Sequence, residues 1–570
     1  MKYIVVVGGV LSGVGKGVAT ASIGRILKEY GFKTTAVKID PYINVDAGTL
    51  RPTEHGEVWV TDDGGEIDQD LGSYERFLGQ DLPKKNNITT GQVYLTVIER
   101  ERRGEYLGKT VQFIPHIPEE IKRRVREAAE GYEVCIVEIG GTIGDYENIP
   151  FLFAMKSLER EIGKENLIYV LLTYLPIPTH INEMKTKPTQ QAIKSLSEHG
   201  IFPDIILCRA KVPLDEIRKK KIETYANIDA EYVISAPDVE SVYQVPLNFE
   251  KENLGKKILD KLHLIPRKTP DWSGWERLVK RIMNPEKVID IGMVGKYIDI
   301  GEFTLTDSYI SVNHAIEHAG AHLGVRLRIN WIDAKKLEEG DPAELLKGLK
   351  GIIVPGGFGT SGIEGKINAI KYARENNIPY LGLCLGMQLA VIEFSRNVIG
   401  LRDANSSEFD INTPHPVIDL LPKQREILMT KRYGASMRLG AYVAALKQGE
   451  VMDLYTKTKR MEKDRVRLGA LEPFRIGKTD LSGPVVIERH RHRYEVNPEY
   501  IEKIENAGLK FTGYHITEEE EPLMEFIEIP DHPYFVATQS HPEFKSRLED
   551  PAPLFLGFGK AVVEIAERGD

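Results

Sequence analysis

Residues that together can hydrolyse an amide occur at two distant places in this sequence. Cys384 ends an apolar run and has a glycine two residues before it and another two residues after it. His541 and Glu543, near the end of the chain, are spaced so that both side chains face the same way on a strand. A lone cysteine in an apolar run is ordinarily a structural residue. The histidine and the carboxylate therefore carry the prediction of a nucleophile, a base and an orienting acid.

A strand, a sharp turn and a helix must hold Cys384 if it is a nucleophile. Residues 379–383 predict the strand, and the pattern after the cysteine predicts the helix. The small residues let the backbone bend tightly. The start of the helix directs N–H groups and partial positive charge at the sulfur, which favours the reactive thiolate.

A second chemical motif lies at the other end of the chain. An apolar strand is predicted at 3–7, a glycine-rich turn at 8–17 and a helix at 18–30, which together indicate a phosphate-binding loop with Lys16 reaching the outer phosphates. The spacing departs from a Walker A loop, because five residues separate Gly9 from the Gly-Lys pair. Gly17 also replaces the serine or threonine that binds magnesium. We therefore expect a metal held mainly by carboxylates from elsewhere.

Two carboxylates are candidates for that metal. Asp70 follows an acidic turn, and Glu138 ends an apolar strand, which is where doubly wound sheets bind ligands. Magnesium prefers oxygen ligands and keeps several waters, so two carboxylates plus phosphates suffice. Lys38, at the end of another strand, could place a cation near the phosphates. Asp62, Asp63 and Asp68 are interpreted as a solvated turn.

A second anion site is predicted at 185–190. Two lysines and two hydroxyl groups precede a helix that begins near Pro188, and such a helix N-terminus binds anions. A polar helix cap explains the same residues equally well. The basic stretch at 218–221 could be an exposed helix face.

Composition limits the class of protein. The 570 residues exceed one hydrophobic core, and 42% hydrophobic with 28% charged residues is typical of a globular protein. A net charge of -9 argues against a nucleic-acid partner. Three cysteines cannot form a disulfide framework, which suggests a reducing, cytoplasmic setting. No apolar window approaches ~20 residues, so we expect no membrane partner.

Strands and helices alternate along most of the chain, which predicts an α/β protein with two doubly wound, mostly parallel sheet domains. Prolines and tryptophans mark a change of character near residue 270. We expect a synthetase domain at 1–266, a linker with one amphipathic helix at 267–286, and a second domain at 287–570.

The second half resembles the class I, or triad, glutamine amidotransferases, through Gly-Leu-Cys384-Leu-Gly-Met-Gln and the later His541-Pro-Glu. The resemblance implies Cys384 as nucleophile, His541 as general base and then acid, and Glu543 as the group that holds the imidazole. It implies an oxyanion loop at 354–359, whose N–H donors contribute roughly 3 kcal/mol each. Other interpretations of the Arg-His string at 488–495 are a solvated strand face or a metal site. The implied glutamine-binding residues are Gly357, Leu385, Gly386, Met387, Gln388, Glu408 and Arg493.

The first half resembles the amidoligase domain of the CTP synthase family, a P-loop-type fold related to dethiobiotin synthetase. The matching strings lie at 8–17, 38–42, 55–58, 68–77 and 138–147, and with the glutaminase motifs the resemblance covers essentially the whole chain. The implied ATP-binding residues are Gly13, Val14, Gly15, Lys16, Gly17, Val18, Asp70, Pro237, Asp238 and Val239. The implied UTP- or CTP-binding residues are Ser12, Asp145, Tyr146, Glu147, Lys185, Thr186, Lys187, Pro188, Thr189, Gln190 and Lys221, in part across a subunit interface.

The resemblance implies an ATP-dependent ligase that aminates UTP to CTP with ammonia from L-glutamine, the last step of de novo pyrimidine nucleotide synthesis. It also implies Mg²⁺ held by Asp70 and Glu138, activation by GTP, feedback inhibition by CTP, a homotetramer, and a closed passage for ammonia between the domains. Thr360-Ser361-Gly362 departs from relatives that carry an arginine there, in a loop linked to the GTP response.

Two alternatives remain open at this point. Another glutamine-dependent amidoligase, such as a cobyrinic acid diamide synthase, would share the phosphate loop and the cysteine turn but would lack the string at 185–190. The second alternative is a P-loop switch protein with an inactive glutaminase domain. The presence of Cys384, His541 and Glu543 argues against it.

Overall fold

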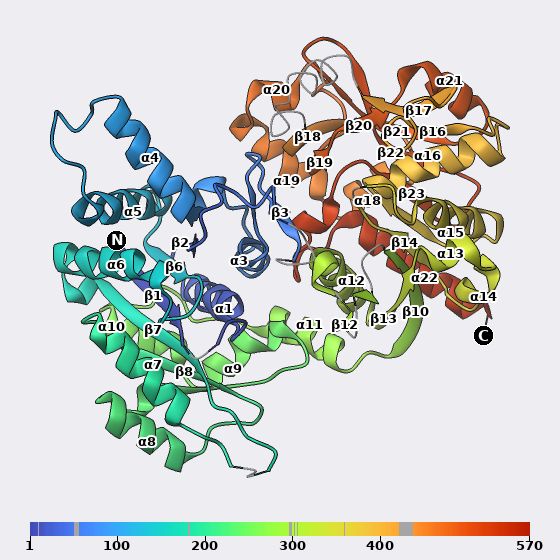
Figure 1. Cartoon of the computed structure of the whole chain (residues 1–570). Coiled ribbons are helices and arrows are strands. Elements are labelled where there is room, and N and C mark those ends of the chain that lie inside the picture. The colour runs from blue at the N-terminus through green and yellow to red at the C-terminus, as the bar shows by residue number, and fades with distance from the viewer. Residues whose placement is uncertain are drawn as a thin grey trace. The chain divides into compact units, whose positions relative to one another are not determined.

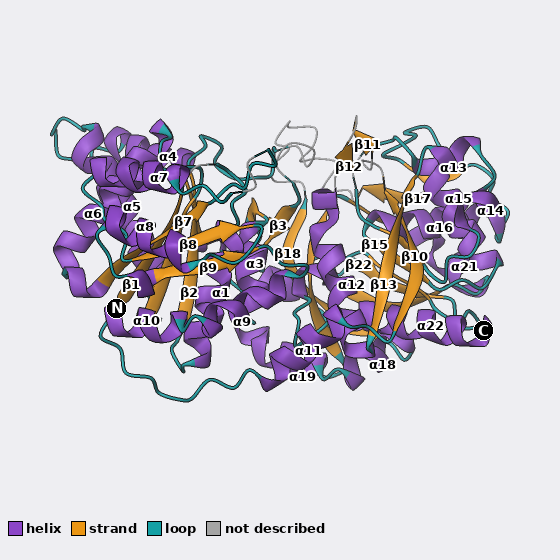
Figure 2. Cartoon of the chain, turned by 90° about the horizontal axis from the view of Figure 1, so that it is seen from below, coloured by secondary structure: helices purple, strands orange, loops and turns teal. Residues whose placement is uncertain are grey.

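A computed structural model describes residues 1–9, 11–50, 56–180, 183–295, 299–300, 303–304, 306–357, 359–420 and 437–569. The contacts divide the chain into two compact units. Unit 1 comprises residues 1–49 and 67–279, and unit 2 comprises residues 280–570 together with residues 50–66. Figure 1 labels their elements, and Figure 2 colours helices and strands separately. The domain limits expected from the sequence stay a prediction.

Unit 1 is built on a parallel sheet, as the alternating pattern predicts. Among the described residues the sheet has seven strands in the order β5-β2-β6-β1-β7-β8-β9, and neighbouring strands run parallel. Its central strands are apolar because both faces are covered by helices. The strands are β1 (Lys2–Gly8), β2 (Thr34–Asp40), β5 (Asn87–Thr89), β6 (Val134–Ile139), β7 (Leu167–Tyr174), β8 (Ile205–Ala210) and β9 (Val233–Pro237).

Helices cover both faces of this sheet. On one face α4 (Thr90–Arg102), α5 (Phe113–Ala129), α6 (Ile149–Ile162) and α7 (Lys187–Glu198) pack with the strands in one core, and α8 (Glu216–Ala226) contacts α7. On the other face α1 (Lys16–Glu29) contacts α3 (Asp70–Leu78), α9 (Val245–Lys251) and α10 (Leu254–Lys261). The strand, turn and helix expected at the phosphate loop are therefore confirmed as β1 and α1.

The amphipathic helix expected near residue 280 is α11 (Ser273–Met283). Trp275 on this helix is buried, and its indole N–H donates to the carbonyl oxygen of Tyr243 at 2.8 Å. The guanidinium of Arg25 lies 4.6 Å from the centroid of the Trp275 ring. The buried Trp275 side chain thus anchors α11, and its only polar group, the indole N–H, has a hydrogen-bond partner.

Unit 2 contains a mixed sheet. Among the described residues nine strands follow the order β13-β10-β14-β15-β23-β22-β21-β18-β19. Pairs from β13 to β23 are parallel and the remaining pairs are antiparallel. The strands are β10 (Lys287–Gly295), β13 (Val325–Asp333), β14 (Ile352–Val354), β15 (Tyr380–Leu383), β18 (Arg438–Leu446), β19 (Val485–His492), β21 (Lys510–Ile516), β22 (Pro522–Glu528) and β23 (Phe535–Thr538).

Two apolar cores flank this sheet. Residues of α13 (Lys336–Glu339), α14 (Pro342–Leu346), α15 (Ile363–Glu375), α16 (Leu385–Asn397) and α21 (Pro498–Asn506) share one core. Residues of α12 (Ile310–Leu323), α18 (Glu450–Lys457) and α22 (Pro553–Gly569) share the other. Two further helices, α19 (Arg460–Arg467) and α20 (Pro473–Ile476), lie in the connection between β18 and β19.

Smaller strands complete the fold. A three-stranded sheet contains β16 (Ala404–Ser406), β17 (His415–Leu420) and β20 (Tyr494–Val496), and β3 (Val58–Val60) pairs with β4 (Glu66–Asp68). Another short pair joins β11 (Asp299–Ile300) and β12 (Phe303–Thr304). Within the described part of the chain, no helix has the length and apolar character needed to cross a bilayer.

Candidate functional site

The candidate nucleophile lies in a strained turn of unit 2. Cys384 connects β15 to α16 with φ 51° and ψ -101°, a backbone conformation that non-glycine residues seldom adopt. A side chain at Gly386 would place its Cβ 2.2 Å from the carbonyl oxygen of Val354, so this position requires glycine. The turn predicted from the sequence is therefore present, and the tertiary contacts around it hold the thiol at the start of α16.

His541 and Glu543 come together as expected, but not on a strand. β23 ends at Thr538, and the two residues lie at the start of a short 3₁₀ helix, Pro542–Lys545, because proline cannot continue the ladder. The Nδ1 atom of His541 lies 2.7 Å from Oε1 of Glu543. The expectation of a shared strand face is corrected, while the predicted pairing stands.

The electrostatics of the histidine favour its charged form. Burial lowers the pKa of His541, but the Glu543 carboxylate and the Cys384 sulfur outweigh burial and raise it to about 10. At neutral pH the imidazole then carries a proton. A charged imidazole next to a cysteine at the start of a helix is an arrangement that suits nucleophilic attack by sulfur.

The loop expected to supply oxyanion donors lies beside the cysteine. Gly357 and Cys384 line the same hollow, and Leu385 is the first residue of α16, where its N–H has no acceptor within the helix. Lys366 of α15 is fully buried, and its Nζ donates to the carbonyl oxygen of Pro355 at 3.3 Å. Sequence reasoning missed Lys366, because a lysine in a helical pattern is usually exposed.

Two hollows meet at Cys384, both lined by residues of unit 2. The first contains most of the expected glutamine-binding residues. Its lining comprises Gly357, Cys384, Leu385, Gln388, Glu408, His492, Arg493 and Tyr494. Gly386 and Met387 are not in this lining, because their position on α16 places them in the core. His492 and Tyr494 were missed, although both belong to the Arg-His string.

The second hollow is lined mainly by apolar surface. Cys384, His541, Glu543 and Phe544 form part of its wall, and Glu57 and Val58 from the early segment of the chain form another part. The carboxylate of Glu57 accepts a hydrogen bond from the backbone N–H of Ser311 at 3.0 Å. Cys384 therefore has a polar cavity and a largely apolar cavity beside it.

The Arg-His string is not a solvated strand face. Its residues 488–492 belong to β19, in which Arg489, His490 and His492 are buried, and residues 494 and 495 belong to β20. Burial and the nearby Arg438 guanidinium hold the pKa of His490 and of His492 well below the usual value. Among the described residues, no group of three or more His, Cys, Asp or Glu side chains that could hold a metal ion is found.

Arg438 compensates two buried carboxylates beneath these histidines. Its guanidinium lies 3.1 Å from Glu495 and 2.7 Å from Glu525. Burial raises the pKa of the Glu495 carboxyl to about 8, although Arg438 opposes the shift. The network links β18, β20 and β22, because Arg438, Glu495 and Glu525 lie one on each of these strands.

In unit 1 the phosphate loop has the expected form. Gly15 precedes α1 with φ 95°, and Lys16 is buried with its Nζ donating to the carbonyl oxygen of Gly141 at 2.6 Å. Burial lowers the pKa of Lys16, and Glu138 opposes that shift. Gly13 has φ 72°, and Ser12 is exposed. The loop therefore combines left-handed glycines, helix N–H groups and one cation, which suits phosphate.

The two expected metal ligands converge on Lys38. Its Nζ pairs with Asp70 and lies 3.2 Å from Glu138, whose other oxygen accepts from the Tyr74 hydroxyl at 2.5 Å. Burial lowers the pKa of Lys38, but the carboxylates of Asp70 and Glu138 outweigh burial and raise this pKa above its usual value. Burial raises the pKa of Glu138 as well. Burying the carboxylates of Asp70 and Glu138 close together is costly unless cations compensate them. Their oxygen atoms are also ligands that suit a divalent metal.

Gly17 explains why the loop lacks the usual hydroxyl. A Cβ at this position would lie 2.2 Å from Oδ1 of Asp70. The carboxylate thus occupies space beside the start of α1 that a serine or threonine side chain would need.

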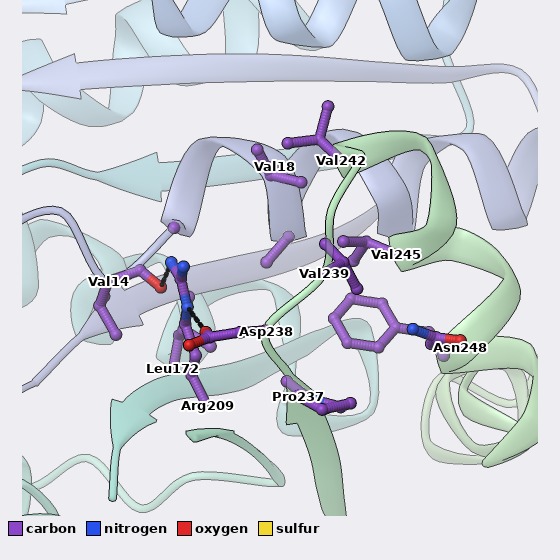
Figure 3. A pocket seen from close by; sticks show the side chains of 14 residues that line it. Val14, Val18, Leu172, Arg209, Pro237, Asp238, Val239, Val242, Val245 and Asn248 are labelled. Atoms are coloured by element: carbon purple, nitrogen blue, oxygen red, sulfur yellow. Dashed lines mark hydrogen bonds and ion pairs between the residues drawn. The ribbon is translucent and has the colours of Figure 1, made fainter. Parts of the chain in front are cut away.

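The loop and the expected residues Pro237, Asp238 and Val239 share one hollow (Figure 3). Val14, Gly15 and Val18 form one wall, and apolar side chains of α9 form another. Arg209, missed from the sequence, donates to the carbonyl oxygen of Val14 at 2.9 Å and to Asp238 at 3.0 Å (Figure 3). Like Lys38 and Glu138, Arg209 is a charged residue at the end of an apolar strand, and this pattern could have identified it as a candidate site residue.

The expected nucleotide residues at 185–190 are only partly gathered. Thr186, Gln190 and Lys221 line an open hollow with Lys220 and Tyr225, which were missed. Lys187 and Pro188 begin α7, Thr189 is buried and bonds Thr173 at 3.2 Å, and Lys185 pairs with Glu183 at 2.6 Å. Asp145, Tyr146 and Glu147 lie outside this lining, and Tyr146 is 86% exposed. Asp145 instead accepts from the N–H of Thr142 at 2.7 Å.

The interpretation of Asp62 as a solvated turn residue is wrong. Its side chain is 21% exposed and pairs with Arg489 at 2.6 Å, with Lys545 at 2.8 Å and with Arg467. All three cations belong to the second half of the sequence. Contacts across more than 400 residues cannot be read from a local acidic pattern.

Comparisons with known proteins agree with both halves of this description. Residues 2–264 match the family described as "CTP synthase N-terminus", and residues 304–561 match "Glutamine amidotransferase class-I". The chain is 50% identical to CTP synthase of Methanocaldococcus jannaschii over 98% of both chains. It is 50% identical to CTP synthase of Pyrococcus abyssi over 100% of this chain and 99% of the relative. A solved glutaminase domain of Trypanosoma brucei CTPS, with bound acivicin, is 37% identical over 48% of this chain and 94% of that chain, with a TM-score of 0.40.

Proposed function

Because the chain belongs to the CTP synthase family, we propose that it forms CTP from UTP, ATP and L-glutamine at two sites, one in each unit. The single observation that carries the proposal is full-length similarity combined with the cysteine turn, in which Cys384 and His541 line one hollow and His541 pairs with Glu543. The same similarity favours this activity over a cobyrinic acid diamide synthase. An inactive glutaminase domain is disfavoured by the preserved triad geometry.

In unit 2 the Cys384 thiolate attacks the amide carbon of glutamine. The N–H groups of Gly357 and Leu385 stabilise the resulting oxyanion. The C–N bond then breaks, and ammonia leaves with the proton of His541, so that a thioester remains on the sulfur. Water attacks the thioester while His541 takes its proton, and glutamate is released. Glu543 keeps the imidazole oriented throughout and stabilises its charged form whenever His541 holds the proton.

Recognition of glutamine falls to the polar hollow. Arg493 suits the substrate carboxylate because its guanidinium donates two parallel hydrogen bonds. Glu408 suits the α-ammonium group. His492 is held neutral by its buried surroundings, so it adds no positive charge that would repel the ammonium.

In unit 1 ATP transfers its γ-phosphoryl group to O4 of UTP, which converts that oxygen into a phosphate leaving group. Ammonia then attacks C4, phosphate departs, and CTP and ADP remain. Lys16 and the N–H groups at the start of α1 stabilise charge on the phosphoryl group. Asp70 and Glu138 would hold Mg²⁺, which when bound neutralises charge on the phosphates. The hollow between residues 14–18 and 237–249 suits the adenine of ATP.

The UTP site is proposed at residues 185–190 and Lys221, with Ser12 and Asp145 to Glu147 contributed from the same or a neighbouring chain. The exposure of Tyr146 supports a role that a partner subunit completes. A homotetramer, feedback inhibition by CTP, activation by GTP and a cytoplasmic location complete the proposal. They rest on the resemblance.

The proposal is tested by assaying the purified chain with UTP, ATP, Mg²⁺ and glutamine. We expect CTP, glutamate, ADP and phosphate in equal amounts. The variant Cys384→Ala should lose glutamine-dependent synthesis and keep ammonium-dependent synthesis, because its unit 1 is unaltered. No CTP from either nitrogen source with the unaltered chain would contradict the proposal.

A further inference from the structure

Residues 56–66 lie in the sequence between two parts of unit 1, but they pack as part of unit 2. Within unit 2, Glu57 and Val58 line the apolar hollow beside Cys384. The segment is anchored at several points along its length. Trp59 is fully buried, with its ring centroid 4.9 Å from that of Phe544. Glu66 pairs with Arg491 at 2.8 Å.

The strongest of these anchors is Asp62. Its carboxylate lies between three cations, of which Arg489 is fully buried and Lys545 nearly so. The carbonyl oxygen of Asp62 also accepts the N–H of Ala441 at 2.9 Å. Gly440 permits this approach, because a Cβ there would lie 2.5 Å from that oxygen.

Two of the cations connect Asp62 to the triad. The carbonyl oxygen of Arg489 accepts the backbone N–H of His541 at 2.7 Å, so this arginine bonds Asp62 through its side chain and His541 through its backbone. Lys545 lies two residues after Glu543, at the end of the same 3₁₀ helix. The position of the segment and the position of the triad are therefore set by one group of ion pairs.

We infer that Asp62 is a positioning residue that holds residues 56–66 as a wall of the apolar hollow, so that ammonia released at Cys384 stays enclosed. This inference rests on the proposed function. A largely apolar hollow favours neutral ammonia over ammonium, because a charged group would lose its hydration there. If the wall is loosened, water enters, and ammonia is protonated and escapes before it reaches UTP.

The inference predicts a specific loss. Asp62→Asn in the full chain should still hydrolyse glutamine, and should still make CTP from added ammonium within about twofold of the unaltered chain, because unit 1 is unchanged. The ratio of CTP formed to glutamate formed should fall by roughly threefold or more, since a buried ion-pair group has lost its anion. Asp63→Asn is the matched control, because Asp63 lies in the same turn and bonds Thr61. Its ratio should equal that of the unaltered chain.

A second variant keeps the test decisive if Asp62→Asn does not fold. Arg467→Gln combined with Glu66→Gln loosens the same segment through two partly exposed ion pairs and leaves Arg489 and Lys545 paired with Asp62. Arg465→Gln is its control, because Arg465 lies on the same helix and donates to Gly483. An unaltered CTP-to-glutamate ratio in folded Asp62→Asn, or in the double variant where the first does not fold, would overturn the inference. Absence of CTP from the unaltered chain would instead overturn the proposed function, and the inference with it.

Discussion

Cys384 differs from the other two cysteines in its surroundings. Cys135 and Cys208 are also buried, and burial raises the pKa of both thiols, although Lys219 opposes the shift at Cys208. At Cys384 a helix start and the charged His541 are added to burial.

The raised pKa of His541 predicts the pH dependence of glutamine hydrolysis. An ordinary imidazole loses its proton near pH 6.5, about three units below the value of about 10 here. The contribution of this ion pair to stability is therefore complete below about pH 6.5 and is lost as the pH rises through about 10. Hydrolysis should stay constant between about pH 7 and about pH 9 and decline near pH 10, as measured by glutamate release.

Glu543→Gln removes the largest upward contribution to that pKa. The alkaline decline should move to lower pH, and hydrolysis near pH 7 should fall by roughly a hundredfold or more. A profile for Glu543→Gln that declines at the same pH as the unaltered chain would show that the carboxylate does not set the charge of the histidine.

Lys366 gives a second prediction at this scale. Its buried Nζ holds the carbonyl oxygen of Pro355, two residues before Gly357. Lys366→Met keeps the length of the side chain but removes this bond, so kcat for glutamine hydrolysis should fall about tenfold, less than the loss of an oxyanion donor itself. KM should change little because Lys366 is absent from the lining of the polar hollow. Lys371→Met, on the same helix, is the control, and an equal kcat in the two variants would reject the role.

Among the elements, α1 and α3 approach closely because residue 17, at the start of α1, is a glycine without a side chain. Gly17→Ala would place a methyl group against Asp70, and either the carboxylate or the start of α1 would have to move. We expect CTP formation from added ammonium to fall at least roughly tenfold, because the carboxylate and the phosphate loop lose their alignment.

Basal glutamine hydrolysis without nucleotides should be unchanged in Gly17→Ala, since the affected helices belong to unit 1. Gly469→Ala serves as a control, because a Cβ there meets nothing within 4 Å. Full ammonium-dependent synthesis by Gly17→Ala would show that Asp70 does not depend on this glycine.

The elements that carry the chemistry were predictable from local patterns. An apolar run that stops at a glycine or a charged residue identified β1, β6, β15 and the loops after them, because a buried strand needs such a run and a tight turn needs small residues. The triad pairing followed from spacing, although Pro542 moved it from a strand to a 3₁₀ helix. Residues whose roles depend on partners far along the chain were missed, and Arg209, Lys366 and Asp62 are of this kind.

The placement of residues 50–66 shows the same limit for a whole segment. Its sequence lies between two parts of unit 1, and its acidic turn has no periodicity that would assign it to another core. Only the tertiary contacts of Asp62, Trp59 and Glu66 assign it to unit 2. Local sequence patterns predict which helix or strand forms. The ion-pair partner of a charged residue that the sequence suggests is exposed depends on the assembled fold.

As a whole, the molecule combines two α/β units that perform different steps on one chain. Neither unit completes the reaction alone, because one liberates ammonia and the other consumes it. The closed passage for ammonia between the domains stays a prediction. Within unit 2, an apolar hollow lies beside Cys384.

The most direct test of this central claim follows the nitrogen atom. The chain is supplied with UTP, ATP, Mg²⁺ and glutamine labelled with ¹⁵N in its amide group, together with unlabelled ammonium at a concentration too low to support CTP synthesis by itself, and CTP is analysed by mass spectrometry. The account predicts that CTP carries the label nearly undiluted, because ammonia passes from Cys384 to UTP without mixing with solvent. CTP labelled only in proportion to the bulk ammonium pool would contradict it.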